Sequence, residues 1–144
     1  MADNDEFFMR EALKMANEAA DLGEIPVGAV VVCNEKIIAR CCNLTQQLND
    51  ATAHAEMQAF TAASSIAGKY LQNCTLYVTL EPCPMCLGAA FWTQIGRIVY
   101  GAADNRKIVK DKSQLLHPKT VIEGGVLEDE CAELLNEFFR NKRN

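Results

Sequence analysis

Two short segments of the chain carry side chains that can bind a metal ion and transfer protons. Residues 52–56 read Thr-Ala-His-Ala-Glu, and residues 81–86 read Glu-Pro-Cys-Pro-Met-Cys. Cys83 and Cys86 are three positions apart where a helix is predicted to start, so both thiols face the same side of one helical turn. The dipole and the free N–H groups of a helix N-terminus favour thiolate over thiol. The two cysteines are therefore candidate ligands of one metal ion.

His54 adds a third candidate ligand from the start of another predicted helix. Three protein ligands of nitrogen and sulfur type leave the fourth tetrahedral position of Zn²⁺ open, which is typical of catalytic rather than structural zinc sites. A water molecule at that position can ionise near neutral pH. Glu56 can accept a proton from that water and return it to a leaving amine, as the hydrolytic removal of ammonia from a heterocyclic ring requires. We therefore predict a catalytic zinc ion with Glu56 as the proton-transferring residue.

The spacing of His54 and Glu56 raises a geometric difficulty. Residues two positions apart point away from each other on a helix surface, so both cannot lie along one helical face. Both side chains can reach the same metal ion only if the ion lies beyond the end of the helix. The sequence leaves this point open.

Length and composition indicate one compact domain spanning residues 1–144. The chain is 49% apolar and 23% charged, which is ordinary for a globular protein and excludes disordered and fibrous classes. It contains no run of 18 apolar residues, and its acidic first residues do not resemble a signal peptide. Seven cysteines at irregular spacings do not suggest a disulfide framework. We therefore expect a cytoplasmic protein with reduced thiols and no membrane segment.

The pattern of apolar residues predicts helices alternating with strands. The alternation favours an α/β fold, a three-layer α/β/α sandwich with a central mixed five-stranded sheet: the first two strands form an antiparallel hairpin and the later strands are parallel. The expected helices cover residues 5–22, 53–65, 83–94 and 128–141, and the expected strands cover 27–33, 37–42, 75–80, 95–100 and a segment beginning at 121–122.

The charges are unevenly distributed along the chain. The formal net charge is −5, yet the segment from Arg97 to Lys119 contains six basic and two acidic residues. Such a basic segment beside an acidic body is compatible with a partner that carries phosphates. A solvated loop with ordinary surface lysines explains the same composition, so charge alone leaves both interpretations open.

The pattern H-x-E followed by P-C-x-x-C is the signature of zinc-dependent nucleobase deaminases. The resemblance extends beyond the metal motif, because nearly the whole chain is similar to the bacterial tRNA-specific adenosine deaminases of the cytidine deaminase-like superfamily. The segments that carry it are residues 23–30, 52–56, 76–86, 101–102 and 125–140, of which the closing Glu-Cys…Phe-Phe-Arg helix is the most particular to the tRNA-acting branch.

This resemblance implies conversion of the wobble adenosine of a tRNA anticodon loop to inosine, by a homodimer with one zinc ion per subunit. It implies that Asn43 hydrogen-bonds the flipped base, and that Ala103 and Asp104 lie near the flanking nucleotides. The chain departs from many members between Asn105 and Pro118, where a lysine-rich segment replaces a glycine-rich stretch.

Two other functions remain open. The first is a deaminase of a free base such as guanine or cytosine, which shares the zinc signature but needs a lid that closes its pocket. The second is a non-catalytic RNA-binding relative, for which Glu56 would have no use. Phe91 and Trp92, on the helix that begins at Cys83, are expected in the core or at a dimer interface.

Overall fold

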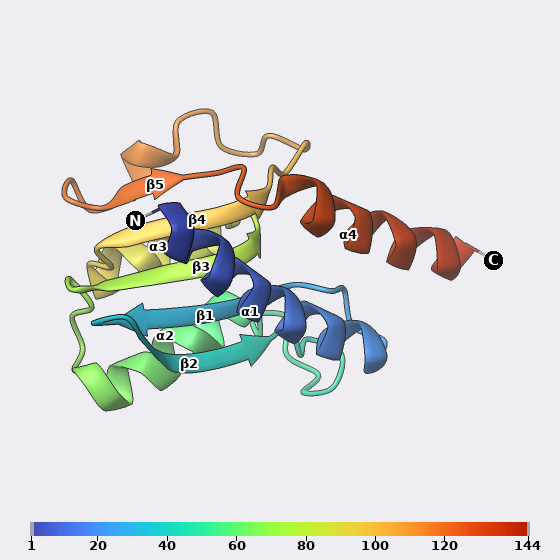
Figure 1. The fold of residues 1–144 in the computed structure, drawn as a ribbon, viewed down its shortest axis with the longest axis horizontal. Helices are drawn as coiled ribbons and strands as arrows, with labels where there is room; N and C mark the ends of the chain where they lie inside the picture. Colours follow the sequence, from blue (N-terminus) through green and yellow to red (C-terminus); the bar gives the residue numbers. More distant parts are fainter. Residues whose placement is uncertain (1, 144) are drawn as a thin grey trace.

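The computed structural model describes the backbone of residues 2–143 and the side chains of residues 4–142. Helices and strands alternate as expected (Figure 1). In chain order the elements are α1 (Ala2–Asp21), β1 (Gly28–Cys33), β2 (Lys36–Cys42), α2 (Ala55–Ala67), β3 (Cys74–Leu80), α3 (Pro84–Thr93), β4 (Arg97–Ala102), the 3₁₀ helix η1 (Lys112–Leu115), β5 (Val121–Glu123) and α4 (Glu128–Arg143).

The strands form one five-stranded sheet in the order β2-β1-β3-β4-β5. Strand β1 pairs antiparallel with β2 and also with β3, whereas β3, β4 and β5 run parallel. This confirms the mixed sheet that the sequence predicts. The direction of pairing changes at β3, so β3 has an antiparallel neighbour on one side and a parallel neighbour on the other.

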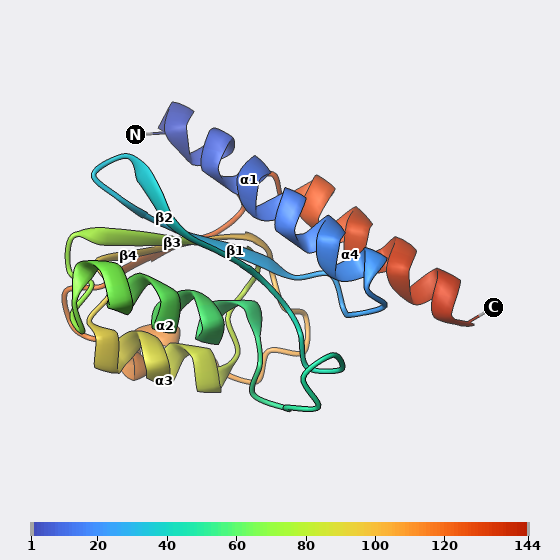
Figure 2. The ribbon, with the colours of Figure 1, turned by 90° about the horizontal axis from the view of Figure 1, so that it is seen from below.

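Helices cover both faces of the sheet, which confirms the three-layer α/β/α architecture. Helices α1 and α4 lie side by side on one face, and α2 and α3 lie on the other (Figure 2). The alternation of side chains along a strand explains the two cores. Val30 and Val32 of β1 pack in the cluster with α1 and α4, whereas Ala29 and Val31 pack in the cluster with α2 and α3.

A glycine in β4 allows α4 to approach the sheet closely. A Cβ atom at Gly101 would lie 2.4 Å from Sγ of Cys131, the buried cysteine in the first turns of α4. No side chain fits at that separation, so any larger residue at Gly101 would push α4 away from the sheet. The close approach matters for function because α4 also forms a wall of the cavity described below.

Two boundaries differ from the sequence-based expectation in ways that affect the site. Helix α2 begins at Ala55 rather than at residue 53, so His54 precedes the helix. Helix α3 begins at Pro84, and Cys83 is its N-cap residue.

The segment expected as an irregular loop after β4 contains the short helix η1, whose N-cap Asp111 accepts a hydrogen bond from the backbone N–H of Ser113. Among the described residues, no helix is both long enough and apolar enough to cross a membrane.

The first turn of α1 is attached to the sheet by a buried carboxylate. Asp5 accepts hydrogen bonds from Nη1 and Nη2 of Arg97 at 2.8 and 2.7 Å and from Oη of Tyr77 at 2.7 Å. The hydrogen bonds from Arg97 hold the pKa of Asp5 below its usual value of 3.8. A carboxyl group whose pKa is lowered by folding stabilises the fold above its unfolded pKa, and this stabilisation is lost as the pH falls through the folded pKa.

Asp5→Asn is therefore expected to lower the free energy of unfolding at neutral pH by about 1.5–3 kcal/mol, the usual range for hydrogen bonds to a charged group. Urea unfolding at several pH values measures this difference. This difference should narrow as the pH falls from about 3.8, the ordinary pKa of the carboxyl, through the lower pKa of Asp5 in the folded protein, because the wild-type side chain then becomes neutral like asparagine. Glu6→Gln, at an exposed position on the same helix, is the control and should change stability by less than about 0.5 kcal/mol. A difference that stays constant with pH would contradict the assigned ion pair.

Candidate metal centre and substrate cavity

The candidate metal ligands lie where two helices begin near the carboxyl end of β3. In open α/β sheets, ligands bind outside the carboxyl ends of the parallel strands, where the arrangement of the strands changes. His54 is the N-cap of α2 and Cys83 is the N-cap of α3, and both have extended backbone geometry. Pro84 occupies the first turn of α3, where its missing N–H group is not needed. Cys86 follows within the same first turn.

The three ligand atoms are spaced as a tetrahedral zinc ion requires. Nδ1 of His54 lies 3.7 Å from Sγ of Cys83 and 3.6 Å from Sγ of Cys86, and the two sulfur atoms are 3.7 Å apart. With Zn–S bonds of about 2.3 Å and Zn–N bonds of about 2.0–2.1 Å, tetrahedral geometry places two sulfurs about 3.8 Å apart and a sulfur and a nitrogen about 3.6 Å apart. These residues form a group able to hold a metal ion, and their donor set fits zinc.

Glu56 lies beside this group, and its position resolves the difficulty posed by the sequence. Because His54 precedes α2 in an extended conformation, its side chain is not bound by the helical spacing that would separate it from Glu56. Glu56 lies in the first turn of the helix and is buried. Burial raises the pKa of Glu56 to about 7, and the neighbouring His54 opposes this rise. A carboxyl group with a pKa near neutrality is well matched to proton transfer.

The two cysteines differ in acidity. The hydrogen bond between the Cys83 and Cys86 sulfurs, together with His54, lowers the pKa of Cys83 to about 4. The hydrogen bond with Cys83, together with burial, raises the pKa of Cys86. The hydrogen bond to Cys83 also raises the pKa of His54. In the protein without metal, Cys83 is therefore the thiolate of the pair. Binding of a metal ion by the three residues would release the remaining protons, because metal ligands must be deprotonated.

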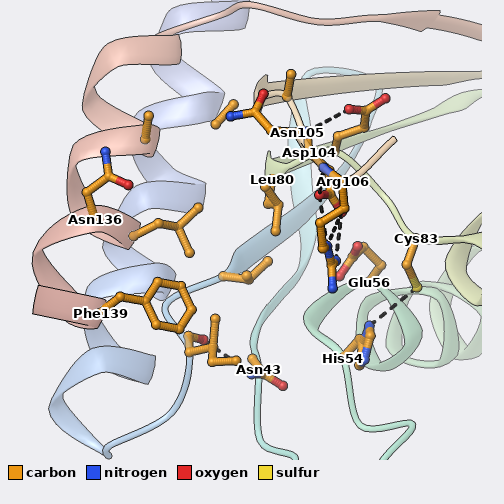
Figure 3. A pocket seen from close by; sticks show the side chains of 17 residues that line it. Asn43, His54, Glu56, Leu80, Cys83, Asp104, Asn105, Arg106, Asn136 and Phe139 are labelled. Atoms are coloured by element: carbon orange, nitrogen blue, oxygen red, sulfur yellow. Dashed lines mark hydrogen bonds and ion pairs between the residues drawn. The ribbon is translucent and has the colours of Figure 1, made fainter. Parts of the chain in front are cut away.

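A cavity of about 540 Å³ opens onto the group (Figure 3). His54, Glu56 and Cys83 line one side of it. The segments that follow β3 and β4 form another side, and α4 forms the opposite wall. The remaining lining residues are Ile25, Val27, Asn43, Leu80, Glu81, Ala102, Ala103, Asp104, Asn105, Arg106, Ala132, Leu135, Asn136 and Phe139.

Asn43 and Asp104, the two residues predicted to bind substrate, both line this cavity. The side chain of Asn43 is buried, donates from Nδ2 to the carbonyl oxygen of Ile25 at 3.2 Å, and accepts at Oδ1 from the backbone N–H of Thr45 at 3.3 Å. The carboxylate of Asp104 is engaged by Arg106, whose Nε and Nη2 donate to it at 2.7–3.2 Å. These hydrogen bonds hold the pKa of Asp104 below its usual range.

Sequence reasoning missed two parts of the cavity. Glu81 is buried, accepts a hydrogen bond from the backbone N–H of Asp104 at 2.7 Å and forms an ion pair with Lys112, so it holds the segment after β4 in place. Asn136 and Phe139 of α4 face the metal group across the cavity (Figure 3). The amphipathic pattern of α4 indicates that one face is buried, but it carries no signal that part of this helix lines a cavity.

The basic segment is partly neutralised within the fold. Arg97 pairs with Asp5 and Glu123, which removes it from the surface available to a partner. Arg106 pairs with Asp104, and Lys112 pairs with Glu81. Lys107, Lys110 and Lys119 are exposed, and none of them takes part in the ion pairs formed by the described side chains. The surface free to meet an anion is therefore smaller than the sequence suggests.

Comparisons with known proteins find deaminases similar to this chain in sequence and fold. The tRNA-specific adenosine deaminase of Bacillus subtilis is 42% identical over 147 residues, which cover 96% of this chain and 91% of the relative. A solved structure from a study of A-to-I editing by tRNA:A34 deaminases at the wobble position of transfer RNA is 38% identical, with a TM-score of 0.80 over 90% of this chain and 99% of its own. The guanine deaminase structure from Bacillus subtilis is 42% identical, with a TM-score of 0.65 over 68% of this chain and 64% of its own.

Two further curated relatives are much longer, and the chain spans 12% and 24% of their length. The family model for the cytidine and deoxycytidylate deaminase zinc-binding region matches residues 2–102, a range that includes all three candidate ligands and Glu56. The chain therefore belongs to the cytidine and deoxycytidylate deaminase zinc-binding family.

Proposed function

We propose that this protein is a zinc-dependent hydrolytic deaminase that converts the wobble adenosine of a tRNA anticodon loop to inosine. In this proposal His54, Cys83 and Cys86 hold one zinc ion per chain, and Glu56 is the catalytic residue. The observation that carries the proposal is the tetrahedral spacing of the three ligand atoms beside a buried carboxylate at one open cavity. The substrate is inferred from relatives that match nearly the full length of the chain and are named for tRNA-specific adenosine deamination.

The chemistry requires a nucleophilic water and a proton carrier. Bound zinc would act as a Lewis acid that lets a water lose its proton near neutral pH. The water oxygen forms a bond to C6 of the adenine ring, and the bond between C6 and the amino nitrogen breaks. Glu56 accepts the proton of the attacking water and delivers it to the departing amino group, so that one water is consumed and one ammonia is released. Asn43 binds the base and holds C6 at the position of attack.

The cavity favours a nucleotide within a larger chain over a free base. A free-base enzyme must enclose a small substrate, whereas an enzyme acting on tRNA must leave its pocket open to an extruded nucleotide. Here α4 packs beside α1 (Figures 1 and 2). Its residues Asn136 and Phe139 line one wall of the cavity (Figure 3). The exposed Lys107 and Lys110 follow the cavity residue Arg106 in the chain and supply positive charge for a phosphate backbone.

We also propose that the enzyme acts in the cytoplasm as a homodimer. Phe91 and Trp92 of α3 are 37% and 77% exposed, and their rings lie 5.4 Å apart in an edge-to-face arrangement. Exposed neighbouring aromatic rings favour an interface, and the homodimer that the family resemblance implies supports a second copy of this chain as the partner. Sedimentation equilibrium should give twice the mass of one chain, and Trp92→Lys should shift the protein towards a single chain.

The proposed substrate is tested by incubating the zinc-loaded protein with total tRNA and with an anticodon stem-loop, followed by nucleoside analysis. We expect inosine in both RNAs and no deamination of free adenine, adenosine, guanine or cytosine. The flipped base alone offers few contacts, so binding energy from the loop must orient the target carbon. Rapid deamination of free guanine or cytosine without inosine in tRNA would assign the chain to the free-base enzymes.

Measurement of binding to the same stem-loop at several salt concentrations locates the phosphate contacts. Affinity for the stem-loop should fall as salt rises, with a logarithmic slope of about 0.7 for each phosphate neutralised on a single strand. Simultaneous replacement of Arg106, Lys107 and Lys110 by alanine should flatten this slope and leave the zinc content unchanged. A control variant with Lys14, Lys36 and Lys69 replaced carries the same change in net charge at exposed positions far along the chain from this segment. Equal salt dependence of the two triple variants would place the phosphate contacts elsewhere.

A further inference from the structure

One fully buried carboxylate has no part in the chemistry described above. Glu24 has 0% exposure, although it lies in the short connection between α1 and β1. Its Oε2 accepts the backbone N–H of Gln47 at 2.7 Å. Its Oε1 accepts the backbone N–H of Gln46 at 3.0 Å and the hydroxyl of Thr45 at 3.4 Å. None of the ion pairs among the described side chains includes Glu24.

The negative charge of Glu24 is thus compensated by one short loop. Burying a carboxylate is costly unless strong hydrogen bonds replace its hydration, and backbone N–H groups provide such bonds. All three donors come from residues 45–47, the loop that directly follows Asn43 and Leu44 after the end of β2. The Glu24 carboxylate therefore holds this loop against the connection between α1 and β1.

The two segments that Glu24 connects also contain both hydrogen-bond partners of the Asn43 side chain. Nδ2 of Asn43 donates to the carbonyl oxygen of Ile25, the residue next to Glu24. Oδ1 of Asn43 accepts the backbone N–H of Thr45, whose hydroxyl donates to Glu24. An asparagine amide has two N–H donors and two lone pairs on oxygen. One donor is used on Ile25 and one lone pair on Thr45, which leaves one donor and one acceptor of Asn43 for a group in the cavity (Figure 3).

We propose that Glu24 is a positioning residue that sets the orientation of the Asn43 amide towards the substrate. The Glu24 carboxylate fixes the loop that contains Thr45, whose backbone N–H donates to Oδ1 of Asn43. Glu24 also directly precedes Ile25, whose carbonyl oxygen accepts from Nδ2 of Asn43. Glu24 contacts neither the metal ligands nor the cavity, so it acts only through Asn43. The inference rests on the proposed function in one respect, namely that Asn43 binds the base.

The first test needs no substrate. In zinc-loaded protein labelled with ¹⁵N, the side-chain amide signals of Asn43 are identified by their loss in Asn43→Ala. Glu24→Gln keeps the shape of the side chain but places an NH₂ group against a backbone N–H. It should shift the Asn43 amide signals and speed their exchange with solvent. Glu11→Gln is the matched control, because Glu11 is also buried but bonds Lys14 and Arg40 away from the cavity. Unchanged Asn43 signals in Glu24→Gln would overturn the proposal.

The second test is a double-mutant cycle in the deamination of an anticodon stem-loop. In the wild-type background, Glu24→Gln should lower kcat/KM on the order of 10- to 100-fold, mainly through KM, with full zinc content. In the Asn43→Ala background the same change should have little further effect. An equal loss in both backgrounds means that Glu24 acts on the fold in general, which refutes a role through Asn43.

The two tests separate this proposal from the proposed function. If the wild-type protein forms no inosine, or Asn43→Ala keeps full activity, the assignment of the substrate or of Asn43 fails, and the amide signals alone decide the role of Glu24. If Glu24→Gln does not fold, Thr45→Val replaces it, because this change removes only the hydroxyl donor to Glu24. It should move the Asn43 amide signals in the same direction by a smaller amount, and signals that do not move would again overturn the proposal.

Discussion

Glu56→Gln is expected to lower the deamination rate about 10²–10⁴-fold, the usual contribution of general acid–base catalysis. The amide can still hydrogen-bond the attacking water, but it cannot accept its proton. Glutamine has nearly the same size as glutamate, so the buried first turn of α2 should keep its packing. Activity on an anticodon stem-loop, measured together with zinc content and melting temperature, checks this expectation.

The decisive comparison is between activity and metal content in the same preparation. A zinc-loaded and folded Glu56→Gln with near-normal turnover would require another residue to carry the proton. Glu81 is the next buried carboxylate of the cavity, but its bonds to the backbone of Asp104 and to Lys112 assign it to holding the segment after β4. Glu81→Gln should therefore affect binding of the RNA more than the chemical step.

Cys86→Ala is expected to lower both the zinc content and the rate, which distinguishes it from Glu56→Gln. Removal of one thiolate leaves two protein ligands, too few for a catalytic zinc site that normally has three. Elemental analysis of the wild-type protein should give about one zinc ion per chain, and the variant should lose most of it on dialysis against a chelator that spares the wild type.

Cys74→Ala serves as the matched control for this experiment. Cys74 is buried like Cys86, but it lies at the first residue of β3, at the opposite end of that strand from the metal group. This variant should lose some stability through its core cavity and retain its zinc. Loss of zinc from both variants would show that metal retention depends on general stability, and full zinc in Cys86→Ala would remove Cys86 from the ligand set.

Much of the fold could be predicted from local patterns. The β-branched run before Asn34 and the following run to Cys42 form the expected hairpin, and the order of helices and strands is confirmed throughout. Helix ends were less predictable. Residues 53 and 54 look helical by their neighbours, yet the chain enters α2 only at Ala55 because His54 adopts an extended N-cap conformation. N-cap geometry depends on the direction from which the chain arrives, which a local pattern does not contain.

The predicted basic surface illustrates a second limit. Composition counts charges but does not reveal their partners. Arg97 forms an ion pair with Asp5, a residue 92 positions away in the chain, and so attaches α1 to the sheet. Lys112 is paired with Glu81. Only the packing of α1 on the sheet and the path of the segment after β4 decide which basic side chains remain exposed. Lys107, Lys110 and Lys119 are left as the exposed candidates for contacts with phosphates.

The sequence by itself determined the chemistry available to this protein. Three features of the site are local: the ligand types, the cysteine pair at one helix start and the carboxylate two residues after the histidine. Local backbone geometry keeps each of them wherever these two helices form. Tertiary structure alone decided the rest. It placed the two helix N-termini together so that atoms 29 and 32 residues apart lie within 3.7 Å, and it set α4 as the opposite wall of the cavity. It also buried Glu24 against the loop after β2, because contacts between distant segments arise only when the sheet and its covering helices pack.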